Sequence, residues 1–403
     1  MNNTTNTNVG FSGLVAENTY QLVKDEREHF FRKYEIIREF QQKSLELFNA
    51  SLKCEFDPEV AELVLNELPE HMGRHFHLEH MADRVSLPVF FRTDEVVPGK
   101  ISEIQSPGSA WGLYEQLYQL VSHFQNDFHS SSLFEKSLAK GFTEALTEYL
   151  GEQPVVHHLI DNASIPAGIR FFIQKTREQG IRYFGYDKNI TPYDCNFLRS
   201  HAFAGLFSDN FFQMRLSQSK DNNLQYDLPP SILFDEKLSL IFPFWEKTRS
   251  YFSDRVRDLF PYTQLIRPEG IVIENGDKLT LEEFLQLPRG SRDYYIKYAG
   301  CDLAINWGSK GVYNAATLSK TKGKEIFDAI SKDFASQRYW VLQKGYSLTE
   351  EAEFITRDDQ KQSMQVHSKF SGFYGPSGLL GILVMQRPFY KVHGSIDTIM
   401  SIV

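Results

Sequence analysis

The chain has 403 residues, of which 41% are hydrophobic and 24% are charged. This composition is typical of globular proteins and excludes a chain that is disordered throughout, while the length predicts two or three structural units. The net charge of −9 disfavours nucleic acid or another polyanion as partner. No apolar run approaches the ~18 residues that a membrane span needs, so we expect no membrane association.

The cysteine pattern predicts a reducing compartment. Cys54, Cys195 and Cys301 are odd in number and far apart, which does not suit a disulfide framework or a zinc site. The first residues carry neither a basic n-region nor an apolar h-region. We therefore expect a cytoplasmic protein.

The N-terminal segment is expected to be helical. Residues 1–15 are polar and should fray, whereas apolar residues recur with helical spacing between 17 and 52, and Asp57-Pro58 begins a further helix. The helices would pack on a core or present a surface to a partner.

Four histidines crowd the segment 71–80. His71 and His75 are four residues apart, as on a zinc-protease helix, but no Glu follows His71, and the order of His77 and His80 matches no such motif. The pattern favours a His-rich surface turn, and a metal enzyme centred on these histidines remains the alternative.

Two alternating strands at 89–105 flank a Pro-Gly turn and predict a β-hairpin. Arg92 and Asp94 lie two apart and share a face of the first strand, as Glu103 and Gln105 do on the second. In simple register Asp94, Glu103 and Gln105 converge into an oxygen site of the kind that Mg²⁺ accepts. The alternative is a solvated hairpin face with ordinary charges.

After helices between 110 and 150, the chain predicts a small parallel sheet. A strand at 154–161, a helix at 165–179 and a strand at 180–186 form a βαβ unit within a lobe at about 151–230. The dinucleotide fingerprint GxGxxG is absent from it.

Beyond Leu228-Pro229-Pro230 the pattern mixes helices and strands. A helix opens near 234–237, a short helix covers 281–287, and a strand at 294–298 carries Lys297. The glycine-rich segment that follows, 299–312, places Lys310 between glycines and can cradle phosphate, or it is a plain turn.

The last third predicts a helix around 324–334 and strands at 338–345 and 378–387. The first of these strands ends in polar residues, and Arg387, Lys391 and His393 follow the second closely.

Taken in order, these pieces resemble the ATP-grasp ligases, and specifically the circularly permuted branch that includes glutathionylspermidine synthase. In that branch the acidic hairpin precedes the phosphate-binding lysines, as it does here. The family's R-x-D strand resembles residues 91–94, Phe-Arg-Thr-Asp, and its E-x-N strand resembles 102–107. Gln105 takes the place of the asparagine and offers the same carbonyl oxygen on a longer arm.

Further motifs resemble the family at four places. The N-K-x-L-L helix resembles 235–240, and the second ATP lysine with its Gly-rich lid resembles Lys297 and 307–311. The strand ending in Gln343 resembles the one that lines the adenine pocket, and Arg387 resembles the arginine that meets the transferred phosphate. The resemblance implies this site: Asp94, Glu103 and Gln105 for Mg²⁺; Lys237, Lys297, Gly308, Ser309, Lys310, Gly311 and Gln343 for ATP; Arg92 and Arg387 as catalytic residues.

The implied fold is an α/β (α+β) ATP-grasp fold with an N-terminal helical segment and a small βαβ lobe. Its parts would be the helical segment 1–85, a metal-binding hairpin with helices at 86–150, the parallel lobe at 151–230 and an ATP-binding lobe at 231–403. The segment 302–312 would close over the site as a lid.

The implied activity is ATP-dependent ligation of a carboxylate to an amine through an acyl phosphate, with release of ADP and phosphate. The substrates would be small molecules or peptides, and a homo-oligomer is compatible with the sequence. The alternative within this fold is a catalytically silent, nucleotide-binding or scaffold protein.

Overall fold

The computed structural model describes residues 14–16, 18–65, 68, 78, 87–105, 110–124, 133–134, 136–159, 167–185, 195–200, 225–227, 232–234, 237–300, 302–306, 310–355, 360–392 and 397–403. No helix in this part of the chain is long and apolar enough to cross a membrane.

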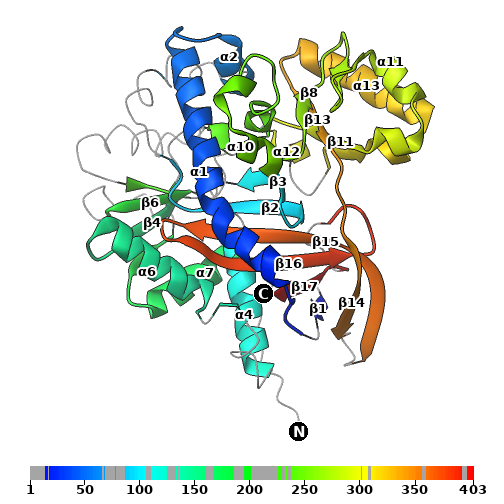
Figure 1. Ribbon diagram of the computed structural model, residues 1–403. Coiled ribbons are helices and arrows are strands. Elements are labelled where there is room, and N and C mark those ends of the chain that lie inside the picture. The colour runs from blue at the N-terminus through cyan, green and yellow to red at the C-terminus, as the bar shows by residue number, and fades with distance from the viewer. Residues whose placement is uncertain are drawn as a thin grey trace.

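A seven-stranded mixed sheet joins the two ends of the chain at the centre of the molecule (Figure 1). Its order is β14-β1-β17-β16-β15-β2-β3; β1 pairs in parallel with β17, and all other neighbours are antiparallel. The strands are β1 (Leu14–Ala16), β2 (Phe91–Val97), β3 (Lys100–Gln105), β14 (Thr349–Ile355), β15 (Lys361–Gly375), β16 (Gly378–Arg387) and β17 (Ile399–Ile402). The predicted hairpin is therefore β2–β3, and β3 is an edge of this sheet.

A single long helix, α1 (Lys24–Leu52), crosses one face of this sheet (Figure 1). Its apolar stripe, which includes Phe30, Ile37 and Phe40, is buried, as the helical spacing in the sequence predicts. The helices α2 (Glu59–Leu65) and α10 (Asp254–Leu259) contact α1, and one hydrophobic core joins them to β2 and β3.

The expected βαβ unit is present. Strand β4 (Val155–Leu159), helix α7 (Ala167–Glu178) and strand β5 (Arg182–Phe184) belong to an all-parallel sheet of order β5-β4-β6-β7. The sheet continues through β6 (Phe197–Ser200) and β7 (Gln225–Tyr226), and α4 (Trp111–Phe124) and α6 (Leu138–Leu150) pack against α7.

A second antiparallel sheet, of order β12-β11-β13-β8, has its own hydrophobic core under α11 (Leu281–Gln286) and α13 (Lys320–Ala335). Its strands are β8 (Thr263–Leu265), β11 (Tyr294–Tyr298), β12 (Val312–Asn314) and β13 (Trp340–Lys344). A two-stranded ribbon, β9 (Ile271–Val272) and β10 (Lys278–Leu279), and the short helix α12 (Leu303–Asn306) complete this part. The strand expected at 294–298 and the helix expected at 281–287 are confirmed.

The α-helix expected near 234–245 is wrong. Residues Leu238–Ile241 form a 3₁₀ turn, η4, in which Phe242 N–H donates to the Ser239 carbonyl. Pro243 explains the difference, because it has no N–H to donate and its ring clashes with the carbonyl four residues earlier in an α-helix. The other 3₁₀ turns are η3 (Ile232–Phe234), η5 (Arg249–Tyr251), η6 (Arg289–Arg292) and η7 (Ala315–Thr317).

Candidate functional site

A polar cavity lies where β2, β3 and β15 of the large sheet face β11 and β13 of the second sheet. Its charged lining residues come from both strands of the β2–β3 hairpin and from five other segments of the chain. Among the described residues they are five lysines and two carboxylates: Lys237, Lys297, Lys344, Lys369, Lys391, Asp94 and Glu103. The cavity wall is therefore net positive, and a ligand with several negative charges suits it.

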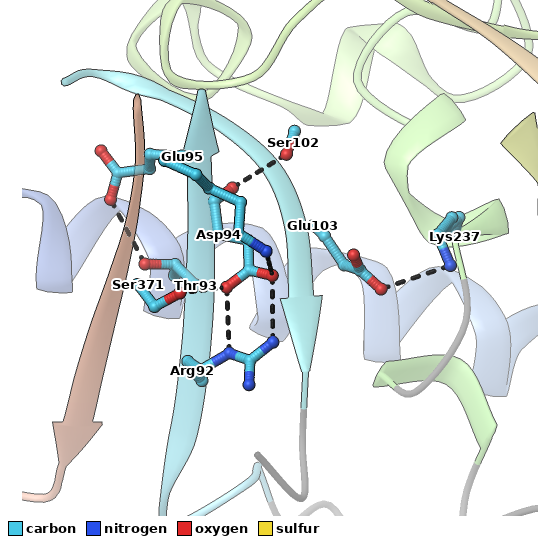
Figure 2. Close-up of polar contacts among 9 residues, drawn as sticks. Arg92, Thr93, Asp94, Glu95, Ser102, Glu103, Lys237 and Ser371 are labelled. Atoms are coloured by element: carbon cyan, nitrogen blue, oxygen red, sulfur yellow. Dashed lines mark hydrogen bonds and ion pairs between the residues drawn. The ribbon is translucent and has the colours of Figure 1, made fainter. Parts of the chain in front are cut away.

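The register of the hairpin places the two carboxylates side by side. Asp94 on β2 pairs with Glu103 on β3, and Arg92 pairs with Gln105. Figure 2 shows Asp94 and Glu103 on adjacent strands, with Arg92 beneath Asp94. The structure thus brings Asp94 and Glu103 together in the cavity, whereas Gln105 lies opposite Arg92 and outside the cavity lining.

Asp94 accepts four hydrogen bonds and is almost fully buried. Arg92 donates from Nε to Oδ1 at 2.9 Å and from Nη2 to Oδ2 at 3.0 Å (Figure 2). Ser371 Oγ donates to Oδ1 at 2.7 Å, and Lys369 Nζ donates to Oδ2 at 3.0 Å. Burial alone would raise the pKa of the Asp94 carboxyl, but Arg92 and Lys369 outweigh it and hold that pKa well below its usual range.

Glu103 forms an ion pair with Lys237, whose Nζ lies 3.3 Å from Oε1 (Figure 2). Lys237 stands at the start of η4, and its backbone N–H donates to the Ala299 carbonyl. Burial opposes ionisation of Glu103, but Lys237 beside it, with a contribution from Lys297, keeps the pKa of this carboxyl below its ordinary value.

Lys297 reaches the cavity from β11 and is held by Gln343 on β13. Its Nζ donates to Gln343 Oε1 at 2.6 Å, while Gln343 Nε2 donates to Thr263 Oγ1 at 3.1 Å and to the Ser102 carbonyl at 3.4 Å. Burial lowers the pKa of Lys297 to about 8; Glu103 opposes this shift, while Lys237 adds to it. Lys297 and Gln343, like Lys237, are among the seven residues predicted from the sequence for ATP binding, and these three line the cavity.

Lys369 and Ser371 come from β15, a strand that the sequence analysis did not anticipate. From 361 to 371 every second residue is polar, and a Pro-Ser-Gly turn at 376–378 leads into the predicted strand at 378–387. Period-two alternation followed by a turn is the signal of a hairpin strand and would have identified β15.

Arg387 lies at the end of β16, beside the cavity but outside its lining. Its Nη2 donates to Asp397 Oδ2 at 2.7 Å and its Nη1 donates to the Lys391 carbonyl at 2.8 Å. Arg387 therefore fixes the segment that carries Tyr390 and Lys391 into the cavity wall.

The glycine-rich segment is only partly described, because Gly308 and Ser309 lie outside the described residues. Lys310 is exposed and does not line the cavity. Gly311 donates its N–H to the Ile305 carbonyl, and a Cβ at this glycine would lie 2.7 Å from Ile305 Cγ2. Gly311 thus permits close backbone packing, and its N–H already has an acceptor within the protein.

The donor set fits a metal ion at one carboxylate only. An ionised carboxylate offers about four acceptor positions, and Asp94 already uses four. Oε2 of Glu103 has no partner among the described residues. Within the described part of the chain, no three His, Cys, Asp or Glu side chains are grouped to hold a metal. His71, His75, His77 and His80 lie outside the described residues.

Comparison with known protein sequences assigns no family to the chain. No protein-family model matches the chain. A stretch of 115 residues is 30% identical to the 7-carboxy-7-deazaguanine synthase of Flavobacterium psychrophilum and covers 27% of this chain and 53% of that protein. The chain thus spans about half the length of this curated relative, and the match shows no family.

Among solved structures, a glutathione synthetase-like effector from Globodera pallida in its apo form aligns with a TM-score of 0.51 and 10% identity. The alignment covers 96% of this chain and 89% of that one. A putative γ-glutamylcysteine synthetase from Methylobacillus flagellatus aligns with a TM-score of 0.41 and 10% identity over 90% of this chain and 88% of that one, which is too weak to add to the argument. The predicted fold class, α/β with an ATP-grasp fold, is confirmed.

Proposed function

We propose that this chain is an ATP-dependent carboxylate–amine ligase that releases ADP and phosphate and forms an amide or peptide-like bond in a small molecule or peptide. The observation that carries the proposal is the cavity between the two sheets, which five lysines line together with Asp94 and Glu103. A triphosphate carries the charge that such a wall neutralises, and the ATP-grasp fold makes ATP the expected source of it.

In the proposed reaction a substrate carboxylate oxygen attacks the γ-phosphorus of ATP. The bond from that phosphorus to the β–γ bridging oxygen breaks, and ADP leaves. The amine nitrogen then attacks the acyl carbon, phosphate leaves with the oxygen that joined it to that carbon, and the nitrogen loses a proton to solvent. The protein supplies positioning and charge neutralisation.

The lysines would share this task by position. Lys237 and Lys297 flank Glu103 and would bind the phosphates, and Gln343 would hold Lys297 in place. Arg92 would act through Asp94, which it grips with two hydrogen bonds. Lys391, fixed through its carbonyl by Arg387, faces the same cavity and suits the substrate carboxylate or its acyl phosphate.

Magnesium would arrive with the nucleotide, since the cavity wall without it is net positive. Three oxygen donors are predicted for the metal. Asp94 and Glu103 both line the cavity, but of these two only Glu103 keeps an oxygen without a partner among the described residues. A bound Mg²⁺ would neutralise charge between the β- and γ-phosphates. The lid role of 302–312 stays a prediction.

The test is the nucleotide product. Purified protein with ATP, Mg²⁺ and pools of amino acids, peptides and amines should release ADP and phosphate in a substrate-dependent manner, and Lys297→Met should release far less. AMP as the product would contradict the proposal, because attack at the γ-phosphorus releases ADP. Full turnover by Asp94→Ala would contradict the role given to the carboxylates.

A catalytically silent nucleotide-binding protein is the second candidate. It is favoured by the saturation of Asp94 and by the place of Gln105 outside the cavity. Titration with Mg·ATP separates the two candidates: tight binding without phosphate release under any substrate pool favours the silent protein.

A further inference from the structure

We infer that Lys369 is a built-in cation: its ammonium group takes the position of a metal ion at Asp94, so that the site accepts a nucleoside triphosphate with one divalent cation, at Glu103. The inference rests on the proposed function for its ligand. It concerns the number of metal ions that accompany that ligand, which can be counted without any turnover.

Asp94 leaves no acceptor position for a metal. Its Oδ1 accepts from Arg92 Nε and Ser371 Oγ, and its Oδ2 accepts from Arg92 Nη2 and Lys369 Nζ. The four contacts lie between 2.7 and 3.0 Å, which is the range of full hydrogen bonds. A metal ion at Asp94 would have to displace one of these donors.

Lys369 is the donor that stands where a cation from the cavity would approach. Ser371 pairs with Asp94 across β15 and β2, so Lys369, two residues earlier, projects from the same face of β15. Its side chain is 16% exposed and lines the cavity, whereas the Arg92 side chain is 6% exposed and lies outside the lining. Arg92 and Ser371 hold Asp94 from within the sheet, and Lys369 covers the side that faces the ligand.

The remaining donors do not make up a second site. Gln105 pairs with Arg92 rather than with a carboxylate and is outside the cavity lining, and the amide oxygen of Gln343, which does line the cavity, accepts from Lys297. Oε2 of Glu103 is the one carboxylate oxygen in the cavity without a partner among the described residues. One oxygen of this kind, together with phosphate oxygens and water, is enough to hold a single Mg²⁺.

The local charges agree with this count. Lys369 and Lys237 each sit against a carboxylate, and Lys297 adds a further positive charge beside Glu103. A fixed ammonium provides one positive charge without the geometric demands of an octahedral ion. Two divalent ions in the same space would add repulsion with these lysines.

The experiment counts Mn²⁺ bound per nucleotide. The full-length protein is saturated with a non-hydrolysable ATP analogue and titrated with Mn²⁺, and free Mn²⁺ is read from its electron paramagnetic resonance signal. We expect one bound Mn²⁺ per nucleotide. Two would overturn the inference and leave the proposed function intact, whereas failure of the analogue to bind would overturn the proposed function.

Replacing Lys369 tests whether its ammonium group is what limits the number of bound metal ions to one. Lys369→Met removes one of the two donors to Oδ2 of Asp94 and opens one acceptor position there, so the count should rise to two. Lys369→Arg keeps a cation and should stay at one. Lys361→Met is the matched control, because it makes the same change on an exposed residue of the same strand, and it should stay at one. A Lys369→Met protein that still binds one Mn²⁺ would overturn the inference. If that variant does not fold, the wild-type count and the Lys369→Arg count decide.

Discussion

Nζ of Lys297 on β11 lies 2.6 Å from Oε1 of Gln343 on the neighbouring strand β13. Gln343 is itself fixed by bonds to Thr263 and to the Ser102 carbonyl of β3. The pair therefore links the second sheet to the hairpin that carries Glu103, and it aims an ammonium group into the cavity.

Removal of this ammonium group should weaken nucleotide binding. A hydrogen bond to a charged group contributes about 1.5–3 kcal/mol, so Lys297→Met should lower the affinity for Mg·ATP on the order of 10- to 100-fold. Isothermal titration calorimetry measures the affinity of each variant for Mg·ATP. Lys332→Met, a change at an exposed lysine of α13, should bind like the wild type. Equal affinity of both variants would remove Lys297 from the site.

Nucleotide affinity should also depend on pH through this group. The pKa of Lys297 is about 8, so the side chain is charged at pH 7 and loses its proton as the pH rises through 8. Affinity for the triphosphate should fall between pH 7.5 and 9, by up to about tenfold per pH unit above the pKa. Burial depresses this pKa in the folded protein, so the unfolded chain binds more protons between pH 8 and 10.5, and the contribution of Lys297 to stability rises with pH over that range.

Substitutions at Gln343 test whether Lys297 is the group whose titration changes nucleotide affinity. Gln343→Glu places a carboxylate against Lys297 and should move the midpoint of the pH profile upward, while it weakens binding at pH 7 by adding a negative charge. Gln343→Leu removes the acceptor without a charge and should not move the midpoint upward. A midpoint that is the same in all three proteins would assign the titration to another group.

Single and double variants can distinguish whether Arg387 positions the segment around Lys391 or contacts the phosphate directly. If Arg387 positions the segment around Lys391, Asp397→Ala should reproduce much of the loss of turnover that Arg387→Ala causes, because both remove the 2.7 Å ion pair between the two side chains. The double variant should then lose little more than Arg387→Ala alone. Independent, additive losses would instead indicate that Arg387 acts directly on the ligand.

The ion pair behind the site should matter for stability rather than for ligand binding. Lys33 of α1 and Glu95 of β2 have fully buried side chains and pair with each other. Lys33→Met leaves the Glu95 carboxylate buried without its ammonium, so we expect a loss of about 3–5 kcal/mol in urea denaturation.

The double variant Lys33→Met/Glu95→Leu should recover much of this loss, because it removes both charges. Lys24→Met, which changes an exposed lysine 4.0 Å from Glu28, should unfold like the wild type. A Lys33→Met protein as stable as the wild type would show that the pair is not formed.

Local pattern was enough to predict the hairpin and its facing carboxylates. The Pro-Gly turn sets the register, and period two sets the faces, so Asp94 and Glu103 meet as expected. The same pattern predicts Gln105 on the face of Glu103, but Gln105 lies outside the lining of the cavity. Which part of a strand face becomes a cavity depends on contacts far away in the sequence.

The hydrogen bonds that Lys369 and Ser371 of β15 donate to Asp94 also depend on contacts far away in the sequence. Lys369 and Asp94 are 275 positions apart, and their contact follows from a strand pairing that no local pattern specifies. By contrast, the sequence itself contains the residue that rules out the α-helix expected after Lys237. Pro243 is incompatible with that helix, so its absence could have been predicted.

The most direct test of the account is a crystal structure of the protein with Mg²⁺ and a non-hydrolysable ATP analogue. The account predicts the triphosphate in the cavity between β2–β3–β15 and β11–β13, with phosphate oxygens within hydrogen-bonding distance of Lys237 and Lys297. A nucleotide bound elsewhere, or a cavity without nucleotide at saturating concentration, would contradict it.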